Sequence, residues 1–268
     1  MSALSFLLKQ IADKQKRGIL GEEIYFRGQH ELQELIPSLL RKDRHYKKPL
    51  EETENNFFCD AWVMGTGELA QTRNSWEALA VFQHYEIPTR LLDWSSSLPN
   101  ALFFALTRCL GCDQRGGCKR LRKSCEGNPV IWVLDPGKMH AKLHADKPVA
   151  EMDAITVGVD SVQDYKDQFV VREASVNSWE FKAGPVFLQI PWTNARMRSQ
   201  KGFFTFHYSD QPLERLLDEA SGLVRIVLTK RERGDVVAEF NALGINEHDV
   251  FTDLVSLANY FKRRYANN

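Results

Sequence analysis

Four of the five cysteines lie within 17 positions of one another, so their thiols could bind a single metal ion. They are Cys109, Cys112, Cys118 and Cys125. Four thiolates satisfy the tetrahedral coordination that a structural zinc ion requires, and three glycines among them allow the tight turns that would bring them together. Two disulfides or an iron–sulfur cluster are alternative uses of the same thiols. We predict one zinc ion, held in a small insertion at residues 109–127.

The same insertion is strongly basic. Five basic residues and no acidic residue occur between Gln114 and Ser124, in the loop 115–123. A loop of this charge, organised by a metal ion, could contact the phosphate backbone of a nucleic acid. A charged loop that contacts only solvent is the alternative interpretation.

Polar residues that could bind a ligand or take part in catalysis also occur in two other segments. Arg27 and Arg90 could each bind a ligand, or each could form a buried ion pair with Asp93. His84 titrates near neutral pH and could act as an acid or a base, although a lone histidine is also typical of a turn. The run Ser95–Ser97 precedes an apolar stretch, where serine is a favoured helix N-cap. The residue types leave a ligand site and a structural network both open.

The helices and strands that the sequence predicts must position these groups. Apolar residues at helical spacing predict helices at 2–17, at two segments between 50 and 84 with a break at 65–67, and at 98–107, 211–220, 231–243 and 250–265. Short apolar segments predict strands at 23–27, 89–93, 129–134, 186–190, 203–207 and 224–228. We therefore expect an α+β fold with a mixed-sheet core, and a single domain over residues 1–268, because no repeat or linker interrupts the pattern.

The overall composition excludes several classes of protein. The 268 residues include 35 basic and 35 acidic side chains, which argues against a nucleic-acid binder with a uniformly basic surface. The sequence contains no run of about 18 apolar residues, so we expect no membrane span. The N-terminus lacks the features of a signal peptide. We expect a cytoplasmic protein, where reducing conditions favour zinc over disulfides.

Two segments resemble the FRG domain family. Residues Tyr25–Gln29 contain the Phe-Arg-Gly tripeptide that names the family, and residues 83–95 are similar to its pattern Gln-His-x-x-x-Pro-Thr-Arg-Leu-Leu-Asp-Trp. Further matches occur at 198–204 and 243–254, and all follow the family order across about 230 residues.

The order of these motifs is similar to that of ADP-ribosyltransferases, which carry an Arg on a first strand, a Ser-Thr-Ser strand before a helix, and a catalytic Glu on a late strand. Arg27 matches the first position and Ser95–Ser97 match the second. The resemblance implies that Arg27 binds the pyrophosphate of NAD and that Ser95 and Gln200 support the ribose, as the candidate catalytic residues. It implies a cofactor site that also includes His84, Arg90, Asp93 and Ser97.

The third motif departs from the transferase pattern. In Gln200-Lys201-Gly202, glycine stands where the catalytic Glu is expected. That carboxylate would stabilise the charge that develops on the ribose as nicotinamide leaves. Either another acid such as Asp93 or Glu180 replaces it, or the pocket binds without catalysing.

The sequence thus predicts an ADP-ribosyltransferase-like α+β fold with a zinc insertion. Two functions stay open: an NAD-using transferase in a toxin or phage-defence setting, or a non-catalytic module that binds a nucleotide or nucleic acid. Both predict that the strands at 24–27 and 90–93 lie close in space. Both also predict one common cleft lined by Arg27, Arg90, Asp93, Ser95 and Gln200.

Overall fold

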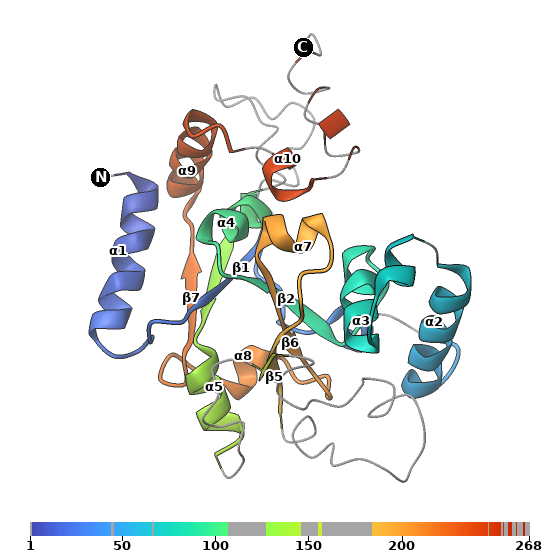
Figure 1. The fold of residues 1–268 in the computed structure, drawn as a ribbon. Coiled ribbons are helices and arrows are strands. Elements are labelled where there is room, and N and C mark those ends of the chain that lie inside the picture. Colours follow the sequence, from blue (N-terminus) through green and yellow to red (C-terminus); the bar gives the residue numbers. More distant parts are fainter. Residues whose placement is uncertain are drawn as a thin grey trace.

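The computed structural model places a central sheet between layers of helices (Figure 1). The residues that it describes are 2–43, 46–65, 67–106, 127–145, 155–156, 184–245, 247–252 and the single positions 254, 257, 258, 261 and 265. Within these residues, no helix is long and apolar enough to span a bilayer.

The sheet contains seven strands in the described part of the chain, in the order β4-β5-β6-β2-β1-β3-β7. Their bounds are Tyr25–Gln29 (β1), Leu91–Ser95 (β2), Val130–Leu134 (β3), Ile155–Thr156 (β4), Val186–Gln189 (β5), Gly202–Phe206 (β6) and Leu223–Val227 (β7). Neighbouring strands are antiparallel, except that the short β4 pairs in parallel with β5. The first strand of the chain therefore lies inside the sheet rather than at its edge.

The two inner strands β1 and β2 meet at a single register position, Phe26 opposite Ser95. In contrast, β1 forms five register pairs with β3, and β2 forms five with β6. The sheet is therefore well paired on either side of the β1–β2 boundary and opens at that boundary.

Three helices cover β1, β3 and β7: α1 (Ala3–Lys16), α4 (Leu98–Leu106) and α9 (Lys230–Ala242) (Figure 1). Apolar side chains such as Leu7, Leu102 and Phe240 form one buried core with Phe26 and Ile131. The carboxylate of Glu239 on α9 accepts hydrogen bonds of 3.0 Å from the backbone N–H groups of Ala3 and Leu4. Because these donors have no partner within α1, the contact fixes α1 against α9.

A second group of helices packs on β2, β5 and β6. It consists of α2 (Leu50–Met64), the 3-10 turn η2 (Gly67–Gln71) and α3 (Ser75–His84). Phe58, Trp76 and Phe82 pack with Leu91 and Phe206 in this core. Asn74 begins α3 as its N-cap, since its side chain accepts a hydrogen bond from the Glu77 N–H.

The other face of the sheet carries a cluster of aromatic residues that includes Tyr25, Trp94, Trp132, Phe187 and Phe203. This cluster is covered by α5 (Pro136–Leu143) and α8 (Leu213–Leu216). Three short elements complete the described fold: η1 (Ser38–Leu40), α7 (Ala195–Gln200) and α10 (Glu247–Val250).

Helix α4 crosses β1 at very short range, at Gly28. A Cβ atom on Gly28 would lie 1.7 Å from the Ala101 carbonyl oxygen and 2.8 Å from the Ala105 nitrogen. Both are backbone atoms, which no rotamer change can move aside. The glycine of the Phe-Arg-Gly tripeptide is therefore required by packing.

Most of the predicted elements are confirmed. Both helices between 50 and 84, the helices at 2–17, 98–107 and 231–243, and all six predicted strands are present within a few residues. The helix predicted at 211–220 is reduced to the short α8, and α7 was not predicted. The insertion at 109–127 and most of 250–265 lie outside the described residues. The α+β fold with a mixed sheet is confirmed, whereas its likeness to ADP-ribosyltransferases stays a prediction.

Candidate functional site

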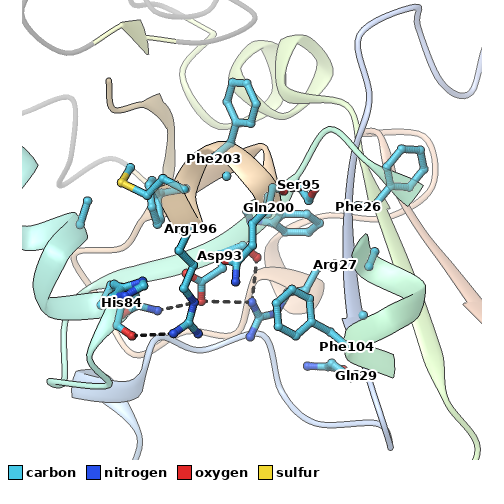
Figure 2. Close-up of a pocket in the computed structure, with 18 of the residues that line it drawn as sticks. Phe26, Arg27, Gln29, His84, Asp93, Ser95, Phe104, Arg196, Gln200 and Phe203 are labelled. Carbon is cyan, nitrogen blue, oxygen red and sulfur yellow. Dashed lines mark hydrogen bonds and ion pairs between the residues drawn. The ribbon is translucent and has the colours of Figure 1, made fainter. Parts of the chain in front are cut away.

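A cavity of about 440 Å³ lies where β1 and β2 diverge (Figure 2). Consecutive residues of β1 line one side of it. The rest is lined by residues of β2, β6, α3, α4 and α7, together with His30, Gln33, Ser38 and Glu86. A cavity of this size is within the range of small-molecule sites. The strands that carry the two sequence motifs are adjacent, as predicted.

Arg27 spans the gap between the two strands. Its Nη1 donates a hydrogen bond of 2.7 Å to the backbone carbonyl oxygen of Asp93, and it lies 3.6 Å from the Asp93 carboxylate oxygen Oδ2. Arg27 thus contacts Asp93, the acid named in the ion-pair alternative, but its short contact is to the backbone and the Asp93 side chain is half exposed. The guanidinium satisfies a strand carbonyl at the point where the β1–β2 ladder has ended.

The charge of Arg27 is only partly compensated. Its side chain is 18% exposed, and its buried Nε has no hydrogen-bond partner among the described residues. Burial lowers the pKa of Arg27, Asp93 acts in the opposite direction, and the charge of Arg41 lowers the pKa further. A partly buried cation with an unused donor favours an anionic or acceptor-rich ligand.

The Asp93 carboxylate is held at the cavity by a chain of side chains. Gln83 donates a hydrogen bond of 2.8 Å from Nε2 to Asp93 Oδ2, and the Thr89 hydroxyl donates one of 2.6 Å to Gln83 Oε1. The Asp93 side chain remains 53% exposed. Gln83 was not predicted as a site residue, although it belongs to the same sequence signature.

Ser95 lines the cavity, but its hydroxyl is already used. Its Oγ donates a hydrogen bond of 2.6 Å to the Gln200 carbonyl oxygen and accepts one of 3.0 Å from the Ser97 N–H. Ser97 does not line the cavity. Its own Oγ accepts from the Asn100 N–H at 3.4 Å, which places it at the start of α4, as the helix-cap interpretation predicted. The expectation that Ser97 belongs to the cofactor site is not met by this geometry.

Gln200 and Gly202 both line the cavity. The Gln200 backbone is held by Ser95, while its buried side-chain Nε2 has no hydrogen-bond partner among the described residues. At Gly202, an added Cβ would meet its nearest atom at 3.8 Å, so there is space for a side chain where the sequence has none. Gln200 thus supplies a second unused donor beside Arg27.

Arg90 lies outside this cavity, so the prediction that it shares the cleft is wrong. It is buried with Glu54 of α2, and its Nε lies 3.0 Å and 2.8 Å from the two carboxylate oxygens. Its Nη1 also donates a hydrogen bond of 2.7 Å to the Tyr208 carbonyl oxygen. The suggested Arg90–Asp93 pair is replaced by Arg90–Glu54, because α2 brings a carboxylate to the buried side of Arg90.

The last predicted residue at the cavity, His84, lies at the end of α3. Its carbonyl oxygen accepts a hydrogen bond of 3.3 Å from Arg196 Nη1. Arg196 also lines the cavity, and its guanidinium lies 4.4 Å from the centre of the Phe251 ring. Sequence reasoning missed Arg196 together with α7, which begins at the N-cap Asn194. The signal that could have predicted α7 is Asn194, because asparagine is a favoured residue at the start of a helix.

A buried chain of polar groups lies next to the aromatic cluster. Trp94 Nε1 donates a hydrogen bond of 3.0 Å to the Thr205 hydroxyl oxygen, which lies 2.9 Å from His207 Nε2. Burial lowers the pKa of His207 to about 3, with a smaller contribution from the charge of Arg27. The folded protein therefore holds this imidazole neutral at physiological pH.

His207 should make the protein less stable in mild acid. A histidine in the unfolded chain titrates near pH 6.5, so below that pH the unfolded state binds a proton that the folded state excludes until about pH 3. The free energy of unfolding is expected to fall by about 1.4 kcal/mol per pH unit in this interval. Urea denaturation near pH 7 and pH 5 should show a loss about 2 kcal/mol larger in the wild type than in His207→Gln. Equal losses in the two proteins would contradict this assignment.

The cysteine insertion, the basic loop 115–123 and Glu180 lie outside the described residues. Among the described residues, no group of His, Cys, Asp and Glu could hold a metal ion. Cys59, the remaining cysteine, is exposed and unpaired. The four-thiolate zinc site therefore stays a prediction.

Protein purified without added metal is expected to contain about one zinc ion per chain, as a four-thiolate site requires. Elemental analysis measures this directly. Cys112→Ser should lose the metal, and Cys59→Ser should retain it, because Cys59 is distant in sequence from the other four thiols. A metal-free chain with four reduced thiols, or with two disulfides, would rule out the site.

Comparison with known proteins agrees with the two sequence motifs. Residues 22–113 match the model of the FRG domain family. The chain contains an FRG domain. The comparison with curated proteins gave no match, and neither did the comparison with solved structures.

Each residue of the tripeptide that names the FRG domain has a separate place in the structure. Phe26 lies in the core beneath α4, Arg27 crosses the gap to Asp93, and Gly28 lets α4 approach β1. The matched segment of the FRG domain contains β1, β2, α3 and α4, whereas α7 and β6 of the cavity wall lie beyond residue 113. The cavity is thus assembled from the FRG motifs and from later parts of the chain.

Proposed function

We propose that the cavity of this FRG domain protein binds a nucleotide through its phosphate, without ADP-ribosyl transfer. The observation that carries the proposal is Arg27, whose partly buried guanidinium lines the cavity and has an unused Nε donor. Guanidinium groups are well suited to phosphate because their planar donors match its oxygens. A phosphate oxygen that reaches Nε would give this donor the partner that it lacks.

Other groups of the cavity suit the remainder of a nucleotide. Gln200 Nε2 is a second unused donor for a carbonyl or phosphate oxygen. Phe104, which is only partly buried, provides apolar surface for a planar ring. Figure 2 shows Arg27, Gln200 and Phe104 around the same space, although they come from three different elements.

The same geometry argues against transfer chemistry. Gly202 supplies no carboxylate at the position where transferases carry their catalytic Glu, and the Ser95 hydroxyl already donates to the Gln200 backbone. Among the described residues that line the cavity, the acidic ones are Glu86 and Asp93. Asp93 is held by Gln83 and lies close to Arg27. Binding thus requires only groups that are in place, whereas transfer requires another acid to take the role of the carboxylate that is missing at Gly202.

The proposal is tested by calorimetric titration with NAD, ADP-ribose, ADP and inorganic phosphate. We expect at least one nucleotide to bind, and Arg27→Gln to weaken it about tenfold or more, since hydrogen bonds to charged groups contribute about 1.5–3 kcal/mol. Arg198→Gln is the matched control, because Arg198 is an exposed arginine of α7 outside the cavity. Binding that is equally weakened by both variants would indicate general charge attraction. Absence of binding to the folded wild type would refute the proposal.

A second candidate function is an NAD-using transferase in which Asp93 replaces the missing Glu, as in a toxin or phage-defence effector. It is favoured by one observation: the half-exposed Asp93 carboxylate lies in the cavity beside the candidate phosphate-binding group. Incubation with NAD should release nicotinamide in this case, and Asp93→Asn should abolish the release. We expect no release from the wild type.

A further inference from the structure

The proposed phosphate binding does not account for the Asp93 carboxylate, a negatively charged group in the same cavity. Its Oδ2 accepts a hydrogen bond from Gln83 and lies 3.6 Å from Arg27 Nη1, which is too long for a direct hydrogen bond. Its Oδ1 accepts no hydrogen bond from the described residues, and the side chain is half exposed. A carboxylate is thus fixed in the cavity with an oxygen available for a ligand.

An ionised carboxylate accepts hydrogen bonds and donates none. It repels a phosphate that approaches it directly, so the part of the ligand that faces Asp93 must carry donors. Arg27 and Gln200 present the opposite requirement, since their unused groups are donors that need acceptors. The cavity is therefore complementary to a ligand that has anionic oxygens on one part and hydroxyl groups nearby.

A ribonucleotide has this arrangement, because the hydroxyls of its sugar are separated from its phosphate by only a few bonds. Acidic side chains accept hydrogen bonds from ribose hydroxyls in other nucleotide-binding folds. We infer that Asp93 accepts a hydrogen bond from the 2′-hydroxyl of the bound ribose and thereby makes the cavity selective for ribonucleotides over 2′-deoxyribonucleotides. The inference rests on the proposed nucleotide binding.

Asp93→Asn separates this role from the structural role of the residue. The short contact of Arg27 is to the Asp93 backbone oxygen, which the substitution leaves in place. Gln83 Nε2 can still donate to the amide oxygen of asparagine. The substitution thus retains size and shape and removes the negative charge and one strong acceptor.

The test compares the affinities of ADP and 2′-deoxy-ADP for the wild type and for Asp93→Asn. The wild type should bind ADP about tenfold or more tightly than 2′-deoxy-ADP, since a charged hydrogen bond is lost in the deoxy complex. Asp93→Asn should bind the two nucleotides within about twofold of each other. If NAD binds and ADP does not, the same comparison is made with NAD and its 2′-deoxy analogues.

Glu86→Gln is the matched control, because Glu86 is the other described acid at the cavity and is exposed. This variant should keep the preference of the wild type. Gln83→Met, which removes the donor that holds the carboxylate, should reduce the preference and serves as the test if Asp93→Asn does not fold.

Three results would overturn the inference: no preference in the wild type, a preference that survives Asp93→Asn, or a gain in affinity for both nucleotides in that variant. The last result would show that Asp93 only repels phosphate. In all three cases nucleotides bind, and the proposed function stands. If no nucleotide binds to the folded wild type, the proposed function fails and the inference fails with it.

Discussion

Replacement of Gly28 by alanine is expected to lower the free energy of unfolding by about 3 kcal/mol, at the upper end of the range for overpacked interiors. The added Cβ would lie 1.7 Å from the Ala101 carbonyl oxygen, so α4 and β1 must move apart. Both elements contribute to the core that contains Phe26 and Leu102, and the displacement would loosen that core. Thermal denaturation should show a melting temperature lower by about 6–12 °C.

Two other glycines provide controls for Gly28→Ala. Gly234 lies within α9, and a Cβ there would meet no atom within 4 Å. Gly234→Ala is expected to raise stability by about 0.5–1 kcal/mol, because alanine is the better helix former. At Gly202, which also lies in the sheet, the nearest contact would be an ordinary 3.8 Å. A Gly28→Ala variant as stable as Gly202→Ala would show that α4 does not approach β1 so closely.

The second large effect is expected at the ion pair between Arg90 and Glu54. Arg90→Met should lower the free energy of unfolding by about 3–5 kcal/mol, because it removes the ion-pair partner of the buried Glu54 carboxylate. Both side chains are about 5% exposed, so solvent cannot replace the lost partner. Chemical denaturation measures the loss.

A double substitution separates the ion pair from the packing around it. Arg90→Met combined with Glu54→Leu removes both charges and should lose much less stability than the sum of the two single variants. The carbonyl oxygen of Tyr208 loses a donor in the single and double variants that lack Arg90, so this loss cancels in the comparison. Strictly additive effects would mean that the two charges do not stabilise each other.

The sequence predicted much of this fold because its helices and strands have clear apolar patterns. The helices around Leu7 and Trp76 and the strands around Ile131 and Phe204 all have core-facing residues at the expected spacing. The short α7 has only one buried residue, Met197, and its six residues are too few for a periodic pattern.

The candidate site was predicted in part. Arg27, Asp93, Ser95, Gln200 and His84 all line the cavity. Their motifs indicated which residues matter but not how their atoms are used, since the Ser95 hydroxyl and the short contact of Arg27 both go to backbone oxygens. These partners depend on where strands end, which no residue type specifies.

Arg90 and the opening of the sheet could not be predicted for a related reason. Alternation along a strand assigns a side chain to one of two faces, but it does not say which helix covers that face. The partner of Arg90 is Glu54, 36 residues earlier in the chain. In the same way, nothing in the two motifs shows that β1 and β2 pair at Phe26 and Ser95 and then diverge.

The pairing of β1 and β2 has a consequence for attempts to produce shorter forms of the protein. The segment that matches the FRG family ends at residue 113, but β1 takes its five register pairs from β3 and β2 takes its five from β6. A fragment of residues 22–113 would hold two strands joined at one position, with their remaining backbone groups unsatisfied. Unpaired strand edges recruit other chains and promote aggregation. Since β3 in turn takes five register pairs from β7, expression of a soluble fragment should require the chain at least to Val227, well past the segment by which the family is recognised.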